Sequence, residues 1–354
     1  MNTTLRHLAP FRIPAGVFIL GMLLTLVVGG ARQALVVGVL AILEVSLSFD
    51  NAVLNAGILR RLNPFWQQMF LTVGLAIAVF GMRLVFPLLI VMVTAGLGLG
   101  TVWDLVLHHP AEYGQHLQEA HPTIAAFGGI FLLMIFLDFL IDESKRVHWL
   151  VVFERPLARV GRLKTLSILI ALVCLLLVAL SLPPYESTRV LVAGAAGLAT
   201  YLAVRGLSRL FAGIGGVSEQ DERHADPRRA VVQVAGKAAL SLFLYLEVLD
   251  ASFSFDGVVG AFAITNNVLA IALGLGIGAL FVRELTVWLV RHQALEAFVY
   301  LEHGAHYGVG ALAVLLAVSL EHEVPELVTG LVGAGFIVWS LASSLKHKYR
   351  SALG

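Results

Sequence analysis

Long apolar segments dominate this chain and limit what it can fold into. Ten of them follow one another, separated by polar connections. A run of roughly 20 apolar residues crosses the hydrocarbon core of a bilayer as a helix. Only 13% of the residues are charged, against about 25% in a typical soluble domain. The sequence therefore predicts an all-α, polytopic membrane protein with ten spans at about 12–30, 33–59, 67–97, 123–141, 165–182, 189–211, 231–264, 267–290, 304–320 and 326–345.

The basic residues are distributed unequally between the two sides that ten spans define. Nineteen of the 24 Lys and Arg residues fall in connections on one side, three lie within spans, and only Arg32 and Arg189 fall on the other side. An excess of Lys and Arg marks the cytoplasmic side of a membrane. We therefore predict an integral protein of the plasma (inner) membrane with both termini in the cytoplasm.

Net charge and cysteine content give little support for a nucleic-acid-binding or disulfide-stabilised protein. A net charge of +1 gives no sign of a nucleic-acid partner, and the single cysteine, Cys174, cannot form an intrachain disulfide. The sequence contains no recognisable soluble catalytic domain or nucleotide-binding loop. We expect a protein that is not an enzyme, has no permanently bound cofactor and is surrounded by membrane lipid, while its oligomeric state stays open.

Two acidic motifs lie inside predicted spans. Residues 44–51 read EVSLSFDN and residues 250–257 read DASFSFDG. The aligned polar positions are Glu44 with Asp250, Ser48 with Ser254, and Asp50 with Asp256. We interpret the repeat as two halves, 1–185 and 186–354, with five spans each. Because five is odd, the second half enters the membrane from the opposite side, which predicts an inverted-topology repeat with both motifs near the midplane.

The helical geometry of the first motif predicts a break in the helix. Placing a carboxylate inside a membrane costs about 2.5 kcal/mol or more in free energy. We therefore expect these acids to be paired, to be protonated or to face water. On an ideal helix Glu44, Ser48 and Asn51 share one face, whereas Asp50 lies about 120° away. We therefore expect both motif helices to unwind around Ser-Phe-Asp, which would free backbone carbonyls as ligands.

The motif side chains suggest a site made only of oxygen ligands. Such sites suit hard divalent cations, Mg²⁺, Ca²⁺ or Mn²⁺. The predicted metal ligands are Glu44, Asp50, Asn51, Asp250 and Asp256, with Ser48, Glu247 and Ser254 as further metal or coupling candidates. For Glu247, a structural carboxylate is an equal alternative.

Each motif is followed by a Gly-rich apolar segment that ends in an arginine, Arg83 or Arg283. We expect these arginines to neutralise carboxylates in structural ion pairs between spans. Such pairing could account for the acidic motifs without any ligand. Alternatively, each arginine competes with a cation for its carboxylate during a transport cycle.

Two peripheral groups have both a metal-binding and a structural interpretation. In the outward segment 101–122, His109, Glu112 and His116 suit one helical face and could receive or release a metal; an ordinary amphipathic surface helix explains them more simply. Asp138 and Asp142, at the cytoplasmic end of the fourth span, could form a vestibule or be solvated charges.

A further histidine pair lies near the start of the ninth predicted span. His303 and His306 are three residues apart and could act as ligands. Span-end hydrogen bonds explain the pair equally well.

The paired motifs resemble the signatures of TerC-type integral membrane proteins. The resemblance covers roughly residues 30–345 and includes AFAIT after the second motif and the stretches FLDFLIDE, VHWLVVFERPLA and YLEHGAHYG, typical of one branch of that family. It implies export of divalent metal, chiefly manganese, and an association with tellurium resistance. It assigns the metal to Glu44, Asp50, Asn51, Asp250 and Asp256. The usual second motif has Asp-Ser where this chain has Asp256-Gly257, so one hydroxyl ligand is missing.

Export of a divalent ion requires an energy source. Moving it outward costs about 4.6 kcal/mol per 100 mV of inside-negative potential. We therefore expect secondary transport with a proton as exchange partner, although the motifs alone would serve import equally well. One alternative is a non-transporting subunit of a tellurite or metal-stress resistance complex that docks through the basic segment 142–164. A second is an intramembrane aspartyl hydrolase using Asp50 and Asp256.

Overall fold

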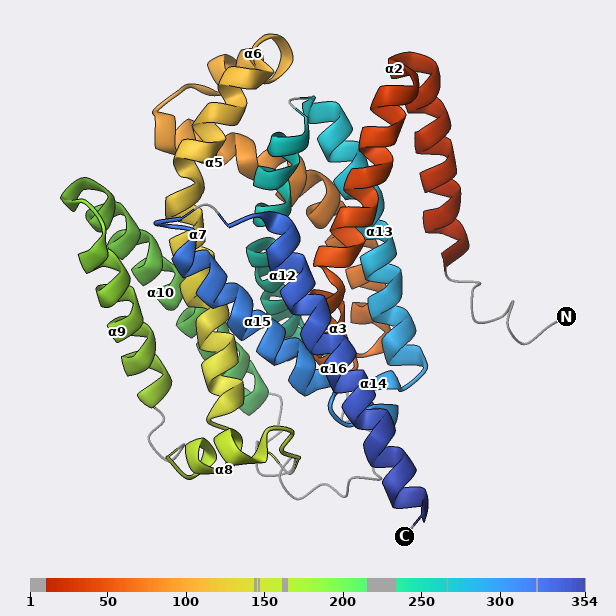
Figure 1. Cartoon of the computed structure of the whole chain (residues 1–354), viewed down its shortest axis with the longest axis vertical. Helices are drawn as coiled ribbons and strands as arrows, with labels where there is room; N and C mark the ends of the chain where they lie inside the picture. The colour runs from red at the N-terminus through yellow and green to blue at the C-terminus, as the bar shows by residue number, and fades with distance from the viewer. Residues whose placement is uncertain are drawn as a thin grey trace, which may run out of the picture.

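The computed structural model describes residues 11–353 except 143–144, 146, 161–164, 215–233, 266 and 323. Within this part the chain is helical and has no strand, only an isolated backbone bridge between Leu62 and Val234. Figure 1 shows the arrangement. The elements are α2 (Arg12–Leu47), α3 (Phe49–Leu59), α4 (Pro64–Met69), η2 (Phe70–Gly74), η3 (Ile77–Val85), α5 (Phe86–Ala95), α6 (Leu99–His108), α7 (Pro110–Leu140), α8 (Val151–Val160), α9 (Leu166–Ser181), α10 (Pro184–Ile214), α12 (Gly236–Ile264), α13 (Val268–Arg291), α14 (Ala294–Ala297), α15 (Leu301–Val318) and α16 (Glu326–Leu353).

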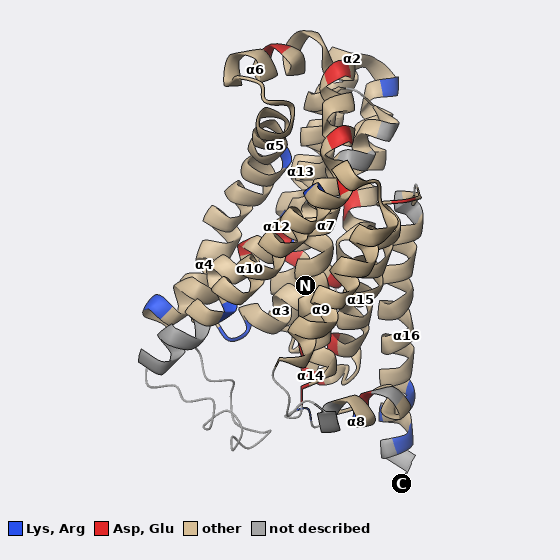
Figure 2. Cartoon of the chain, turned by 90° about the vertical axis from the view of Figure 1, so that its left-hand side faces the viewer, with Lys and Arg blue, Asp and Glu red and all other residues tan. Residues whose placement is uncertain are grey.

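Long apolar helices make this an all-α, membrane-embedded protein. Among the described residues, seven helical stretches are long and apolar enough to cross a bilayer: Arg12–Leu47, Pro64–Ala95, Pro110–Leu140, Pro184–Leu207, Val268–Arg291, Leu301–Val318 and Val328–Arg350. Each of the ten predicted spans overlaps a helix, and the number of crossings stays a prediction. Figure 2 shows Lys and Arg gathered near α8 and the end of α16, whereas acidic residues also lie inside the bundle.

The first predicted span is the first arm of α2, and the second predicted span comprises the second arm of α2 together with α3. The chain reverses at Gly30, whose φ of 77° and ψ of 178° are open to glycine but strained for other residues. Figure 1 shows the two arms side by side, joined at the top of the view. The second arm carries the first acidic motif back into the bundle.

The two motif helices differ in continuity. The helix breaks at Ser48, with φ −99° and ψ 15°, between α2 and α3. In contrast, α12 runs without interruption from Gly236 to Ile264 through the second motif. The predicted unwinding of that motif is therefore wrong. A continuous helix satisfies its own backbone hydrogen bonds, which matters most where no water can replace them.

The motif helices lie at the centre of the helical packing. Helix α12 packs against α3, η3, α7, α13 and α16, and α13 also packs along α2 and α3. Helices α15 and α16 pack together, and both contact α3 (Figure 1). Side chains of the first motif therefore face α12, α13, α15 and α16.

Candidate functional site

An ion pair joins the first motif to the third apolar segment. The guanidinium of Arg83, in η3, pairs with Oε1 of Glu44, and both side chains are buried. A second guanidinium nitrogen of Arg83 donates to the carbonyl of Ala78 over 2.6 Å. Ser48 Oγ donates to the same Glu44 oxygen over 3.1 Å. The charge of Glu44 is therefore compensated inside the bundle, as a buried carboxylate requires.

A corresponding cluster surrounds the arginine of the second half. Arg283, in α13, lies 3.3 Å from Glu247 Oε2 and 3.4 Å from Asp250 Oδ2. Its other terminal nitrogen donates to the carbonyl of Phe70 over 2.5 Å. The fit depends on Gly74, because a Cβ there would lie 2.3 Å from both Arg283 Nη1 and Glu247 Oε1. Glu247 therefore forms an ion pair with Arg283, which agrees with the structural alternative for this carboxylate.

One side-chain hydrogen bond connects the two motifs directly. Asn51 Nδ2 donates to Asp250 Oδ1 over 2.9 Å, so residues 199 positions apart in the chain meet. Both oxygens of Asp250 then have partners, Asn51 on one and Arg283 on the other. Two buried atoms nearby, Asn51 Oδ1 and Ser254 Oγ, have no hydrogen-bond partner in the described part of the chain. Unpaired polar atoms are costly in a membrane interior and favour a bound ligand or ion.

Asp50 differs from Glu44 and Asp250 in its surroundings. Asp50 is only 4% exposed, and its carboxylate accepts a hydrogen bond from the backbone N–H of Asn51 over 2.9 Å. No Lys, Arg or His among the described residues forms an ion pair with it. It lies where α15 and α16 cross, since a Cβ at Gly308 or Gly333 would be 3.2 or 3.0 Å from Asp50 Oδ2. Asp50 is therefore a buried carboxylate whose charge lacks a described counter-ion.

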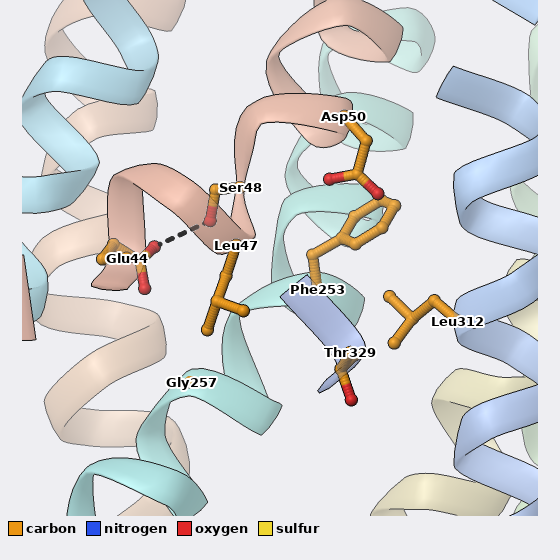
Figure 3. Close-up of a pocket in the computed structure, with 8 residues that line it drawn as sticks. All are labelled: Glu44, Leu47, Ser48, Asp50, Phe253, Gly257, Leu312 and Thr329. Carbon is orange, nitrogen blue, oxygen red and sulfur yellow. Dashed lines mark hydrogen bonds between the residues drawn. The ribbon is translucent and has the colours of Figure 1, made fainter. Parts of the chain in front are cut away.

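A small pocket lies between the motifs. Figure 3 shows Glu44 and Ser48 on one side of Leu47, and Asp50 beside the ring of Phe253 on the other. Its lining residues are Glu44, Leu47, Ser48, Asp50, Phe253, Gly257, Leu312 and Thr329. The pocket thus combines an apolar wall with oxygen-bearing side chains. Such a site can hold a cation or a proton.

One protein-family model matches most of the chain. It is described as Protein of unknown function (DUF475) and matches residues 49–351. The chain belongs to the DUF475 family. No curated protein and no solved structure matches it.

The predicted ligands whose side chains are described are divided between two places. Among the described residues, no group of three or more His, Cys, Asp or Glu side chains is arranged to hold a metal ion. Glu44 and Asp50 share the pocket, whereas Asp250 is held by Asn51 and Arg283. Asp256 lies in α12, but its side chain is outside the described residues. Glu44, Ser48 and Asp50 are therefore the predicted side chains that the structure brings to the pocket.

The predicted outward cluster is not assembled as a metal site. His109 lies between α6, which ends at His108, and α7, which begins at Pro110. His116 Nδ1 lies 3.3 Å from Glu119 Oε2, and Glu112 is exposed in the first turn of α7. These positions agree with a helix surface.

Asp138, predicted to contribute to a cytoplasmic vestibule, is engaged in contacts between helices. Its carboxylate pairs with Arg205 and accepts a hydrogen bond from Tyr201 over 2.5 Å, which ties α7 to α10. Asp142 is exposed just beyond α7. His306 stacks on Phe139 with 3.8 Å between ring centroids. These contacts agree with the structural interpretation of Asp138 and His306.

Sequence reasoning missed a buried carboxylate in α8. Glu154 is fully buried and accepts hydrogen bonds from Lys145 Nζ and the backbone N–H of Leu150, each over 3.1 Å, and from Tyr307 over 3.2 Å. Burial raises the pKa of Glu154, but the bond from Leu150 and the charge of Lys145 outweigh burial and leave this pKa below its usual value. Through the hydrogen bond from Tyr307, Glu154 connects α8 to α15. Its only sequence signal is a lone acid in an amphipathic segment.

Proposed function

We propose that this protein is a secondary transporter that exports a divalent cation, with Mn²⁺ as the leading substrate, in exchange for protons. Asp50 carries the proposal. An uncompensated carboxylate is unstable in a dry interior unless it binds a proton or a cation. Because Asp50 also lines the pocket between the motifs, the same carboxylate can hold either one in turn.

The alternation between proton and metal supplies the energy for export. Outward movement of a divalent ion opposes an inside-negative potential by about 4.6 kcal/mol per 100 mV. In one state Asp50 binds the metal together with Glu44, and in the other it is protonated. Protons that enter as the ion leaves offset this cost. The outward direction itself follows from the resemblance to TerC-type proteins.

The packing supports an inverted repeat of two five-span halves. Exchanging the halves would map α3 onto α12, η3 onto α13 and α7 onto α15, and each of these pairs is in contact. In this proposal the halves rock about their shared contacts and open the pocket to one side at a time. The gathering of basic residues near α8 and the end of α16 supports ten crossings with cytoplasmic termini.

The arginines have a separate role from the ion. Arg83 and Arg283 compensate Glu44 and the Glu247–Asp250 pair. They pair with these acids in the absence of an ion, while Asp50 remains without a cationic neighbour among the described side chains. The site therefore holds fixed ion pairs beside one exchangeable carboxylate.

Total cell manganese tests the proposal. Manganese-loaded cells would express wild type, Asp50→Asn, Asp256→Asn or Asp104→Asn at matched levels, with elemental mass spectrometry as the readout. Asp104 is a matched control because it lies in α6 with a side chain 61% exposed. We expect lower manganese in wild type and Asp104→Asn than in the two motif variants. Equal manganese in all four would reject manganese export; a selective fall in another metal would replace the substrate.

A further inference from the structure

The two motifs make corresponding contacts that are chemically unequal. In the alignment Glu44 corresponds to Asp250, and Asn51 corresponds to Gly257. On one side, the Asn51 amide donates to Asp250 Oδ1 over 2.9 Å. On the other side, Gly257 faces Glu44, and a Cβ at Gly257 would lie 3.1 Å from Glu44 Oε2. The same contact is thus closed by an amide in one half and left open by glycine in the other.

This difference leaves one carboxylate oxygen available. Both oxygens of Asp250 have partners, Asn51 and Arg283. Glu44 Oε1 accepts from Arg83 and Ser48, whereas no hydrogen bond to Glu44 Oε2 is found in the described part of the chain. Glu44 and Gly257 both line the pocket, and Figure 3 shows them on the same side of it.

We propose that Gly257 determines where the cation binds. Its missing side chain leaves Glu44 Oε2 open to an ion in the pocket that Asp50 also lines, whereas the Asn51 amide occupies the corresponding position at Asp250. This inference rests on the proposed transport function and assigns its binding position. An ion held there by the few oxygens of Glu44, Ser48 and Asp50 keeps water ligands, as Mg²⁺ and Mn²⁺ readily do.

Gly257→Asn tests this assignment because it copies the opposite half. The new amide would donate to Glu44 Oε2 and occupy the space beside it. Gly257→Ala is the matched variant, since its methyl group occupies part of that space without donating a hydrogen bond. The assay is Mn²⁺ titration calorimetry on the purified full chain in lipid nanodiscs, with thermal unfolding in the absence of metal as the folding control.

We expect Gly257→Asn to weaken Mn²⁺ binding by about tenfold or more and Gly257→Ala by about threefold, with metal-free unfolding midpoints near that of wild type. Wild-type affinity in a folded Gly257→Asn protein overturns the inference. If that variant does not fold, Gly257→Ala decides: a threefold loss supports the inference and unchanged affinity overturns it.

Asp50→Asn distinguishes a failure of the role assigned to Gly257 from a failure of the proposed transport function. Binding by wild type that is lost in Asp50→Asn but retained in Gly257→Asn rejects the role of Gly257 and keeps the proposed function. No Mn²⁺ binding by wild type rejects the proposed Mn²⁺ transport itself.

Discussion

Asp50→Asn distinguishes an exchangeable carboxylate from a structural one. Asp50 is 4% exposed, accepts a hydrogen bond from the backbone N–H of Asn51, and has no ion-pair partner among the described side chains. Burying one charge costs several kcal/mol after relaxation, and protonation avoids only part of that cost. Asparagine keeps the shape and one acceptor oxygen without the charge. We therefore expect the metal-free variant to match wild type or to gain about 1–2 kcal/mol in unfolding free energy.

Thermal unfolding in nanodiscs with and without Mn²⁺ measures this effect. A gain of about 1–2 kcal/mol corresponds to a rise of about 1–3 °C in the unfolding midpoint of a chain of this length. Mn²⁺ at about 100 times its dissociation constant should stabilise wild type by about 2.7 kcal/mol and leave Asp50→Asn unchanged. A metal-free Asp50→Asn protein that is less stable than wild type by more than about 1 kcal/mol would refute the reasoning, because Asp50 would then contribute a stabilising charge.

Three further predictions concern the neighbouring contacts. Arg83→Gln leaves Glu44 buried without its cation and should cost about 3–5 kcal/mol in chemical unfolding; adding Glu44→Gln should recover part of the loss, and additive losses would exclude coupling. Gly333→Ala places a methyl group 3.0 Å from Asp50 Oδ2 and should slow Mn²⁺ flux in vesicles. Gly335→Ala is its control: no atom lies within 4 Å of the new Cβ, and the flux should not change. Burial raises the pKa of Glu154, yet its hydrogen bonds and cationic neighbour lower it overall, so its stabilisation is present above the ordinary value of 4.5 and lost as pH falls through the lowered folded-state pKa. Glu154→Gln should therefore flatten the acid side of the midpoint–pH curve, and an unchanged curve would contradict this.

The helices were predictable because apolar run length is a local property of the sequence. Each predicted span overlaps a helix, and the break at Ser48 falls within the expected Ser-Phe-Asp region. The second motif was predicted wrongly, since Ser and Gly tolerate both helical and broken backbone and the surrounding packing decides between them. Its helix, α12, is continuous.

The partners of the charged residues could not be derived from spacing. Two arginines and several acids allow several pairings, and only the packing places Glu247 beside Arg283 and leaves Asp50 over the glycines of α15 and α16. The contact between Asn51 and Asp250 likewise joins segments 199 residues apart. The sequence indicated which residues carry the chemistry, and the fold determines which of them are already compensated.

The most direct test of the account is Mn²⁺ flux in proteoliposomes that contain the purified protein, a trapped metal-sensitive dye and an imposed pH gradient. The account predicts Mn²⁺ movement that is driven by an opposing proton gradient in wild type and falls to the rate of protein-free vesicles in Asp50→Asn. Wild-type flux that ignores the pH gradient, or equal flux through Asp50→Asn, would contradict proton-coupled transport through Asp50.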